Sequence, residues 1–144
     1  MKKIILSLSL VAGMMTTYAN PPSQKASTLA SFKKKYPGAE QISWTKEKRY
    51  DKASFSLNNH RVIAYYAPNG EFIGSMRSIF FDELPLLVMK ALEKKYSLQV
   101  ILDISEITNP EGTFYRLIIE KKNKRYRVRL TDQGEVLETS RKHK

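Results

Sequence analysis

The sequence contains no cysteine among its 144 residues, and it contains only two histidines. A chain without thiols forms no disulfides, has no cysteine nucleophile and cannot build a cysteine-based zinc site. His60 stands beside a predicted turn and His143 in a charged tail. We expect both side chains to be solvated, and their separation excludes the helical motif in which two histidines bind zinc. The composition therefore argues against thiol, redox and zinc chemistry.

Local motifs of catalysis are also missing. No serine lies in a Gly-x-Ser-x-Gly elbow, and Gly74-Ser75 falls inside a predicted strand rather than at a strand-to-helix turn. No glycine-rich phosphate loop is present. Asp82 and Glu83 open a predicted helix, where their charges would complement the helix N-terminus. We therefore predict a protein that is not an enzyme and has no catalytic residue, cofactor or metal site, although a site assembled from distant residues would leave no such motif.

One long apolar stretch, Ile4–Met15, follows Lys2 and Lys3 and precedes the small-residue segment Thr17-Tyr18-Ala19. This order is typical of a secretory signal peptide, and the stretch is too short to span a bilayer comfortably. A buried N-terminal helix is the weaker alternative, because the stretch has no polar face. We predict cleavage after Ala19, no stable membrane insertion afterwards, and a periplasmic or secreted mature protein.

Acidic residues are scarce, since 14 of them face 25 lysines and arginines. Removal of Lys2 and Lys3 with the signal peptide leaves 23 basic residues and a net charge of +9. In an intracellular protein such a balance would suggest nucleic acid first. Export excludes that partner and favours an acidic protein, an anionic glycan or a lipid headgroup.

Two similar stretches lie in different halves of the chain. The segment RVIAYYAPNGEFIGS covers residues 61–75, and RYRVRLTDQGEVLET covers residues 125–139. Each has alternating apolar residues on both sides of a turn that ends in Gly-Glu. Asn69-Gly70 is a strong hairpin signal, because the turn type that matches strand twist needs φ > 0 at both central positions. We predict two β-hairpins.

The same order of elements is predicted around both hairpins. In the first unit, Ser27 or Thr28 begins a helix that ends at about Tyr36, before Pro37-Gly38. In the second unit, Asp82 or Glu83 begins a helix that ends at Tyr96. The predicted strands are 39–45, 50–57, the two arms of the 61–75 hairpin, 100–107, 113–121, 125–130 and 135–139.

This order predicts an α+β fold made of a tandem repeat of one helix plus four antiparallel strands. We expect an eight-stranded antiparallel sheet with two helices on one face. The predicted divisions are a signal peptide (1–19), a disordered leader (20–26), a first unit (27–80), a second unit (81–140) and a basic tail (141–144).

Trp44 is the only tryptophan. Its spacing from Ile42 puts the two on one strand face, and the repeat places Leu102 and Ile104 at the equivalent positions. Since both equivalents are core residues by type, we expect Trp44 to pack under the first helix against Phe32 or Tyr36. The alternative is an exposed anchor for a partner.

Several structural motifs together resemble a known family. They are the helix end Phe32…Lys35-Tyr36-Pro37, the strand Ile42-Ser43-Trp44, the strand Val62–Tyr66 with Asn69-Gly70-Glu71, and Leu84-Pro85…Lys95-Tyr96. With them the chain resembles the secreted bacterial PepSY-like proteins, which are similar in fold to β-lactamase-inhibitor proteins. The resemblance spans about residues 27 to 139. It implies a non-enzymatic domain of tandem helix-plus-sheet units, exported to the periplasm or beyond.

Charge alternation suggests a binding face. Six of the nine residues from Lys121 to Arg129 are basic, and alternation puts the arginines on the face opposite Tyr126 and Val128. The repeat and the neighbouring strands add further residues to that face, mixing arginine with aromatic and apolar types that are enriched at recognition surfaces. The predicted binding residues are Lys52, Arg61, Ile63, Tyr65, Arg116, Ile118, Arg125, Arg127 and Arg129. The alternative is that these charges only keep the strands solvated.

Three functions remain open at this point. The first is an exported, non-enzymatic module that holds an unidentified envelope or secreted protein on the open sheet face. The second is a polyanion binder, for lipopolysaccharide or an acidic glycan. The third, suggested by fold alone, is an inhibitor of an exported hydrolase.

Overall fold

The computed structural model describes residues 25–142. The predicted signal peptide, most of the predicted leader and His143 lie outside the described residues. Neither described helix is long and apolar enough to cross a membrane. The first helix begins at Ala26, one residue inside the predicted leader, and the last strand extends to Arg141, one residue into the predicted tail.

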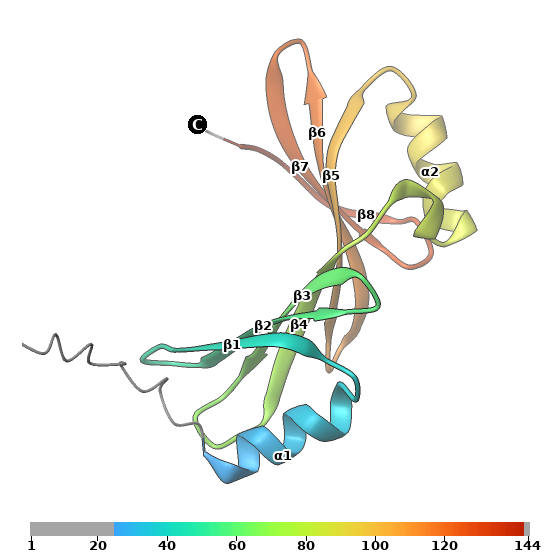
Figure 1. The fold of residues 1–144 in the computed structure, drawn as a ribbon. Coiled ribbons are helices and arrows are strands. Elements are labelled where there is room, and N and C mark those ends of the chain that lie inside the picture. The colour runs from blue at the N-terminus through green and yellow to red at the C-terminus, as the bar shows by residue number, and fades with distance from the viewer. Residues whose placement is uncertain (1–24, 143–144) are drawn as a thin grey trace, which may run out of the picture.

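The same order of elements, one helix and four strands, occurs twice along the chain (Figure 1). The first half contains α1 (Ala26–Lys35), β1 (Glu40–Lys46), β2 (Asp51–Leu57), β3 (His60–Tyr66) and β4 (Phe72–Ser78). The second half contains α2 (Leu86–Tyr96), β5 (Val100–Asn109), β6 (Gly112–Lys121), β7 (Lys124–Thr131) and β8 (Val136–Arg141), and a short 3₁₀ turn, η1 (Phe81–Glu83), precedes α2.

All eight strands form one antiparallel sheet in the order β1 to β8. Ala64, Ser75 and Thr108 are direct partners across β3, β4 and β5, so the helix-covered face continues from one half into the other. Both helices therefore lie on the same face, which confirms the predicted fold class. Figure 1 shows α1 below the first half and α2 beside the second, on the outer side of a bent sheet.

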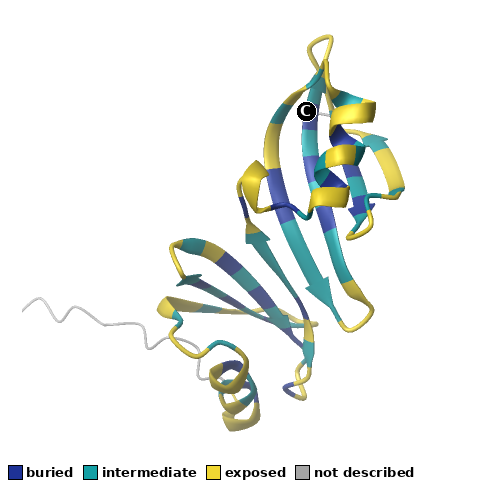
Figure 2. Cartoon of the chain, turned by 90° about the vertical axis from the view of Figure 1, so that its right-hand side faces the viewer, coloured by how far each residue is buried: buried dark blue, intermediate teal, exposed yellow. Residues whose placement is uncertain are grey.

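Each helix packs its apolar side against its own four strands, and the buried residues lie along the strands beneath it (Figure 2). Phe32 and Leu92 take the same place in α1 and α2, and both are 2% exposed. The core around Phe32 is mainly aromatic, whereas that around Leu92 is mainly aliphatic. The spacing of apolar residues by three and four positions in each helix produces this one-sided burial.

The position of Trp44 agrees with the core prediction. Its ring lies edge-on to Phe32 at 5.3 Å between centroids, and Tyr66 lies 5.9 Å away. The prediction that Leu102 is a core residue is wrong, because Leu102 is 45% exposed while Ile104 is 6% exposed. An irregularity in β5 between Ile101 and Asp103 turns Leu102 outward.

The same correction applies to Ile42 in β1. It is 45% exposed, so it does not share the buried face with Trp44. The β1–β2 register shifts between Glu40 and Ser43, and Gln41 has a φ of 51°. A bulge thus occurs near the start of the first strand in both halves, and strict alternation cannot predict it.

The Asn69-Gly70 hairpin exists, but its turn type differs from the prediction. Gly70 has a φ of 93°, and Asn69 is not among the described residues with positive φ. Instead, the Asn69 side-chain oxygen accepts a hydrogen bond from the Glu71 amide at 3.1 Å, and the Gly70 amide donates to the Ala67 carbonyl at 2.8 Å. This is the longer type of hairpin loop, with glycine at the one left-handed position.

The turns with two left-handed residues lie elsewhere, at Asn58-Asn59 and Lys122-Asn123. These two-residue turns join β2 to β3 and β6 to β7. Asparagine tolerates positive φ, but Lys122 does so at a steric cost.

The second helix begins later than predicted, at Leu86. Pro85 restricts the residue before it to extended geometry, and Leu84 accordingly has a ψ of 146°. Asp82 and Glu83 therefore lie in η1 rather than in the helix. Their predicted role at the helix N-terminus is wrong.

Glu83 instead stabilises the segment that connects the two halves. Its carboxylate accepts a hydrogen bond from the Phe80 amide at 2.7 Å and lies 3.1 Å from Nε2 of His60. Nδ1 of His60 is 3.0 Å from the Ser78 carbonyl, to which it donates. The His60 side chain is only 18% exposed, so the expectation of a solvated histidine is wrong.

Candidate functional site

The candidate site is the face of the sheet that neither helix covers, which we call the open face. Lys52 faces Tyr65 across β2 and β3, and Arg116 faces Arg129 across β6 and β7. Since direct cross-strand partners share a face, the register places all the predicted residues on the open face. They are Lys52, Arg61, Ile63, Tyr65, Arg116, Ile118, Arg125, Arg127 and Arg129.

The centre of the open face is apolar. Ile63, Met76, Ile107 and Phe114 are successive direct partners across β3, β4, β5 and β6. All four side chains are partly exposed. We call this set the central apolar row, and it crosses the junction between the two halves. An apolar centre with a polar rim is the usual anatomy of a protein interface.

A hollow of about 320 Å³ lies beside this row. Tyr65, Met76, Ile107 and Arg116 line it, together with Gly74. Gly74 is the direct partner of Tyr65, and a Cβ on it would lie 3.0 Å from the Thr108 carbonyl oxygen. Glycine therefore permits the close approach of β4 to β5 and leaves no side chain beside the tyrosine.

The arginines of the open face are in different environments. Arg116 is held inward, with Nη2 2.9 Å from Sδ of Met76 and 3.2 Å from Oγ of Ser105. The Arg129 guanidinium lies 4.5 Å above the Phe114 ring. Arg127 is exposed, and its direct partner in β6 is Ile118. Arg127 is therefore best placed to contact a partner.

Acidic residues also lie on the open face. Asp103, Glu120 and Glu138 are direct partners of Ile118, Arg125 and Arg129. Glu120 lies 3.6 Å from the Arg125 side chain. In the second half, three carboxylates thus accompany four arginines. The face is less basic than the arginine pattern alone indicated, and its charges are mixed.

On the helix-covered face, polar contacts join the two halves at their junction. Arg77 in β4 pairs with Glu106 in β5 at 3.3 Å, and the Tyr115 hydroxyl donates to the same carboxylate at 3.4 Å. Burial and the nearby Glu106 charge raise the pKa of the Tyr115 hydroxyl. These contacts fix the register between β4 and β5, on which the central apolar row depends.

A second exposed apolar group lies outside the open face, around η1. Phe80 is 72% exposed, and Leu86 and Leu87 are 59% and 49% exposed. They sit on the connection and the first turn of α2. Any test of the open face must therefore distinguish it from this connection.

Sequence reasoning found the flanks of the open face but missed its centre. Met76, Ile107 and Phe114 were not predicted, because their proximity to Ile63 depends on the pairing of β4 with β5. That pairing joins strands separated by a whole helix, so no hairpin turn reveals its register. In the described part of the chain, no group of three or more metal-binding side chains of the types His, Cys, Asp and Glu comes together.

Comparison with known proteins gives the fold. No family model and no curated protein matches the chain. A Bacteroides eggerthii protein, which its description assigns provisionally to the periplasm, is 26% identical, covers 83% of this chain and 89% of its own, and has a TM-score of 0.74.

Two further solved structures are similar. A DUF2874 family protein from Bacteroides ovatus is 21% identical over 83% of this chain and 88% of its own, with a TM-score of 0.75. A BLIP-like protein from Bacteroides fragilis, named for β-lactamase-inhibitor protein, is 20% identical over 88% of this chain and 89% of its own, with a TM-score of 0.76. The chain therefore has the BLIP-like fold.

Proposed function

We propose that the chain is an exported, non-enzymatic binding module, similar to PepSY-like proteins, that holds a protein partner on its open face. The central apolar row carries this proposal. Four apolar side chains aligned across four strands remain partly exposed on a face that neither described helix covers. Burying such a row against a partner is favourable by roughly 25 cal/mol per Å² of apolar surface.

The residue types around the central apolar row indicate what kind of partner surface would fit. Tyr65, Arg127 and Arg129 surround the apolar centre, and tyrosine and arginine are the types that most often dominate interface energy. Glu120 and Glu138 lie among the arginines, so a partner surface must present charges of both signs. We therefore favour a folded protein with an apolar contact segment and a mixed-charge rim. The provisional periplasmic description of the Bacteroides eggerthii protein supports an envelope location.

The absence of cysteine makes a site-directed crosslinking test possible. Arg127→Cys would carry the only thiol of the chain, on the open face, and could be coupled to a photo-activated crosslinker. Two matched labels test other surfaces: Lys33→Cys on the exposed side of α1 and Leu86→Cys on the connection. In native envelope, we expect one crosslinked protein of defined mass from position 127 alone. The same product from position 33 or position 86 would contradict the proposed face.

The identified partner then allows a quantitative test by calorimetry. We expect a one-to-one complex that Phe114→Ala and Arg127→Glu each weaken at least tenfold, because each removes a contact at the centre or rim of the face. Lys33→Glu makes the same charge change away from it and should leave affinity unchanged. Equal affinity of all variants would overturn the assignment of the site.

The two other functions predict different results. A polyanion bound on the open face would lose affinity steeply with added salt and would form heterogeneous complexes rather than one stoichiometric species. The carboxylates among the arginines weigh against it. An inhibitor would slow an exported hydrolase, such as a β-lactamase, at micromolar concentration. That possibility derives from the BLIP-like fold alone.

A further inference from the structure

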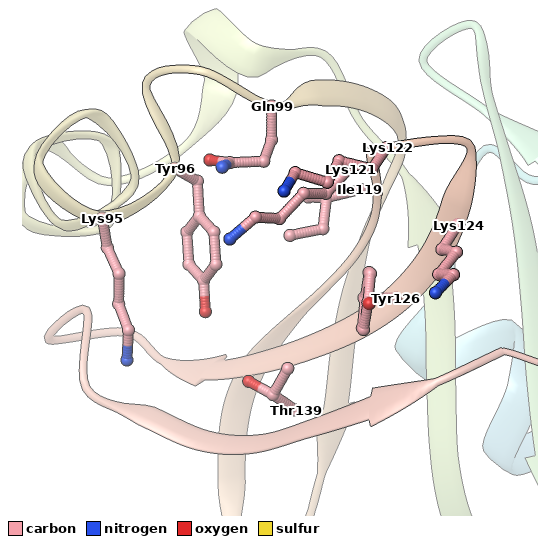
Figure 3. A pocket seen from close by; sticks show the side chains of 9 residues that line it. All are labelled: Lys95, Tyr96, Gln99, Ile119, Lys121, Lys122, Lys124, Tyr126 and Thr139. Carbon is pink, nitrogen blue, oxygen red and sulfur yellow. The ribbon is translucent and has the colours of Figure 1, made fainter.

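A pocket of about 430 Å³ opens at the end of the second half, between the C-terminus of α2 and the β6–β7 hairpin (Figure 3). Buried Ile119 lines it from the helix-covered face of β6. The pocket is thus separate from the open face. Its volume falls in the range of small-molecule sites, roughly 300 to 1,000 Å³.

Four lysines surround this pocket. Lys121 and Lys124 are direct partners across β6 and β7, which places like charges side by side on one face. Lys122 follows in the turn, with a φ of 50°, and Lys95 comes from the last turn of α2. Among the described residues that line the pocket there is no carboxylate. Like charges directly opposite one another destabilise a sheet, and a bound anion would offset their repulsion.

The interior of the pocket offers apolar surface and a buried polar atom without a partner. Tyr96 points into it from the end of α2, and Lys121 and Lys122 extend towards this ring (Figure 3). Tyr126 lines the wall formed by β7. The side-chain oxygen of Gln99 is buried and has no hydrogen-bond partner within the described residues. A buried acceptor without a donor is unfavourable, and a ligand hydroxyl that donates to it would remove this cost.

The first half shows that the fold does not require such a pocket. At the matching positions, the direct cross-strand partners are Leu57 and His60 rather than two lysines. Phe55 stands in place of Ile119, and its ring lies 4.8 Å from that of Tyr36. Ala39 stands in place of Gln99. The smaller apolar residue, the amide and the cations therefore occur together in the second half only.

We propose that this pocket binds a sugar ring that carries an anionic group, such as a uronic acid or a sugar phosphate. The anionic group pairs with Lys121 and Lys124, the ring lies against Tyr96, and a hydroxyl donates to Gln99. The source is either a soluble acidic glycan or a phosphorylated glycolipid headgroup, which share this chemistry. The proposal does not depend on the function of the open face.

Nuclear magnetic resonance titration of the ¹⁵N-labelled protein tests this directly. Glucuronic acid and glucose 1-phosphate are the probes, and glucose is the neutral control. We expect an anionic probe to shift the Gln99 side-chain amide and the Tyr96 and Lys122 backbone amides, with little effect from glucose. Shifts confined to the open face, equal shifts with glucose, or no shift with either anionic probe would overturn the proposal.

Four variants separate a built site from general charge attraction. Lys121→Gln with Lys124→Gln should weaken binding at least tenfold, whereas Lys33→Gln with Lys34→Gln removes the same charge from α1 and should change affinity less than twofold. Ile119→Phe introduces the residue of the first half and should close the pocket without altering charge. Gln99→Ala should weaken binding severalfold even if Ile119→Phe fails to fold. Unchanged binding by Gln99→Ala and by folded Ile119→Phe would overturn the site.

Vesicles distinguish the two sources of the ligand. Phosphatidylcholine vesicles with lipid A present a phosphorylated sugar, and vesicles with phosphatidylglycerol present a phosphate without a sugar ring. Binding of lipid A vesicles that Gln99→Ala weakens supports a glycolipid source, and binding of the soluble probes alone supports a glycan source. Equal binding of both vesicle types, insensitive to Gln99→Ala, would overturn recognition of a sugar.

Discussion

The two halves of the molecule have the same order of one helix and four strands, but different side chains pack between the helix and the sheet. In the first half, a Cβ added to Gly70 would lie 2.9 Å from Oγ of Ser27 in α1. In the second half, a Cβ added to Gly134 would lie 2.7 Å from the Leu87 carbonyl oxygen in α2. Each helix thus rests on the glycine of its own hairpin turn. The close contact of helix and turn is common to both halves, whereas the core beneath each helix is not.

The first core is built mainly from tilted and edge-on rings, and the second mainly from branched aliphatic side chains. Phe32, Trp44 and Tyr66 correspond in position to Leu92, Ile104 and Leu130. Close packing requires matched volumes rather than one residue type, so both solutions support the same fold. The difference has consequences for stability that single substitutions can measure.

The largest expected effect is the loss of the central ring of the first core. Phe32 lies within 6.4 Å, centroid to centroid, of four other aromatic rings. Phe32→Ala should lower the free energy of unfolding by about 3–5 kcal/mol, and Leu92→Ala by less, because ring pairs add to the cost of the cavity. Urea unfolding followed by circular dichroism measures both. An equal loss would show that the aromatic contacts add nothing.

A gain in stability is expected where the first half buries a hydroxyl that the second half lacks. Thr28 is fully buried, and its hydroxyl has no partner among the described residues. Val88 holds the matching position in α2 and is also fully buried. Thr28→Val should raise the free energy of unfolding by about 1–3 kcal/mol, since it removes an unsatisfied polar atom at nearly constant volume.

The reverse substitution is the control for this prediction. Val88→Thr places the same hydroxyl under α2 and should destabilise by a similar amount. Urea midpoints at constant slope compare the pair. A loss of stability in Thr28→Val would mean that its hydroxyl has a partner after all.

Alkaline pH should affect the first half more than the second. Burial raises the pKa of Tyr36, and burial together with the nearby Tyr36 raises the pKa of Tyr66. In the second half, burial and the Glu106 charge raise the pKa of Tyr115. A pKa raised by folding gives stability that is complete below the ordinary value of 10.0 and is lost as pH rises above it. The free energy of unfolding should therefore fall as pH rises above 10, and two such groups should cause a larger fall than one.

Phenylalanine variants test this difference. The unfolding free energy of Tyr36→Phe with Tyr66→Phe should fall less between pH 9 and pH 11 than that of the original chain. Tyr115→Phe should flatten the profile less, because it removes one group instead of two. Parallel profiles for all three proteins would contradict the assignment.

The sequence allowed prediction of the features that depend on local patterns. Alternation in β3 and β7 predicted which side chains lie on the open face, and the repeat predicted that Trp44 packs against Phe32 under α1. Prediction failed at Ile42 and Leu102, because a bulge reverses the direction of side chains without a distinctive residue type. It failed at Asp82 and Glu83 because Pro85 holds the residue before it in extended geometry, so the helix can begin only after Leu84.

The candidate sites show the same division. The arginines of β7 could be predicted from alternation, but the central apolar row required the register between β4 and β5. Prediction of the pocket would have required the distance between α2 and the β6–β7 hairpin, which no local sequence pattern gives. Lys121, Lys122 and Lys124 were visible in the sequence only as part of a charged run.

The smallest expected effect concerns these lysines, which separate the halves most clearly by charge. Lys124→Gln removes one of two like charges that face each other directly, where the first half has Leu57 and His60. It should raise the unfolding free energy by about 0.2–1 kcal/mol in 10 mM salt, and less in 500 mM salt because ions screen the repulsion. Lys48→Gln, in an exposed loop, is the control for loss of charge alone. Urea unfolding at both salt concentrations measures the effect, and a stability unchanged in low salt would show that the lysine pair carries no strain for an anion to relieve.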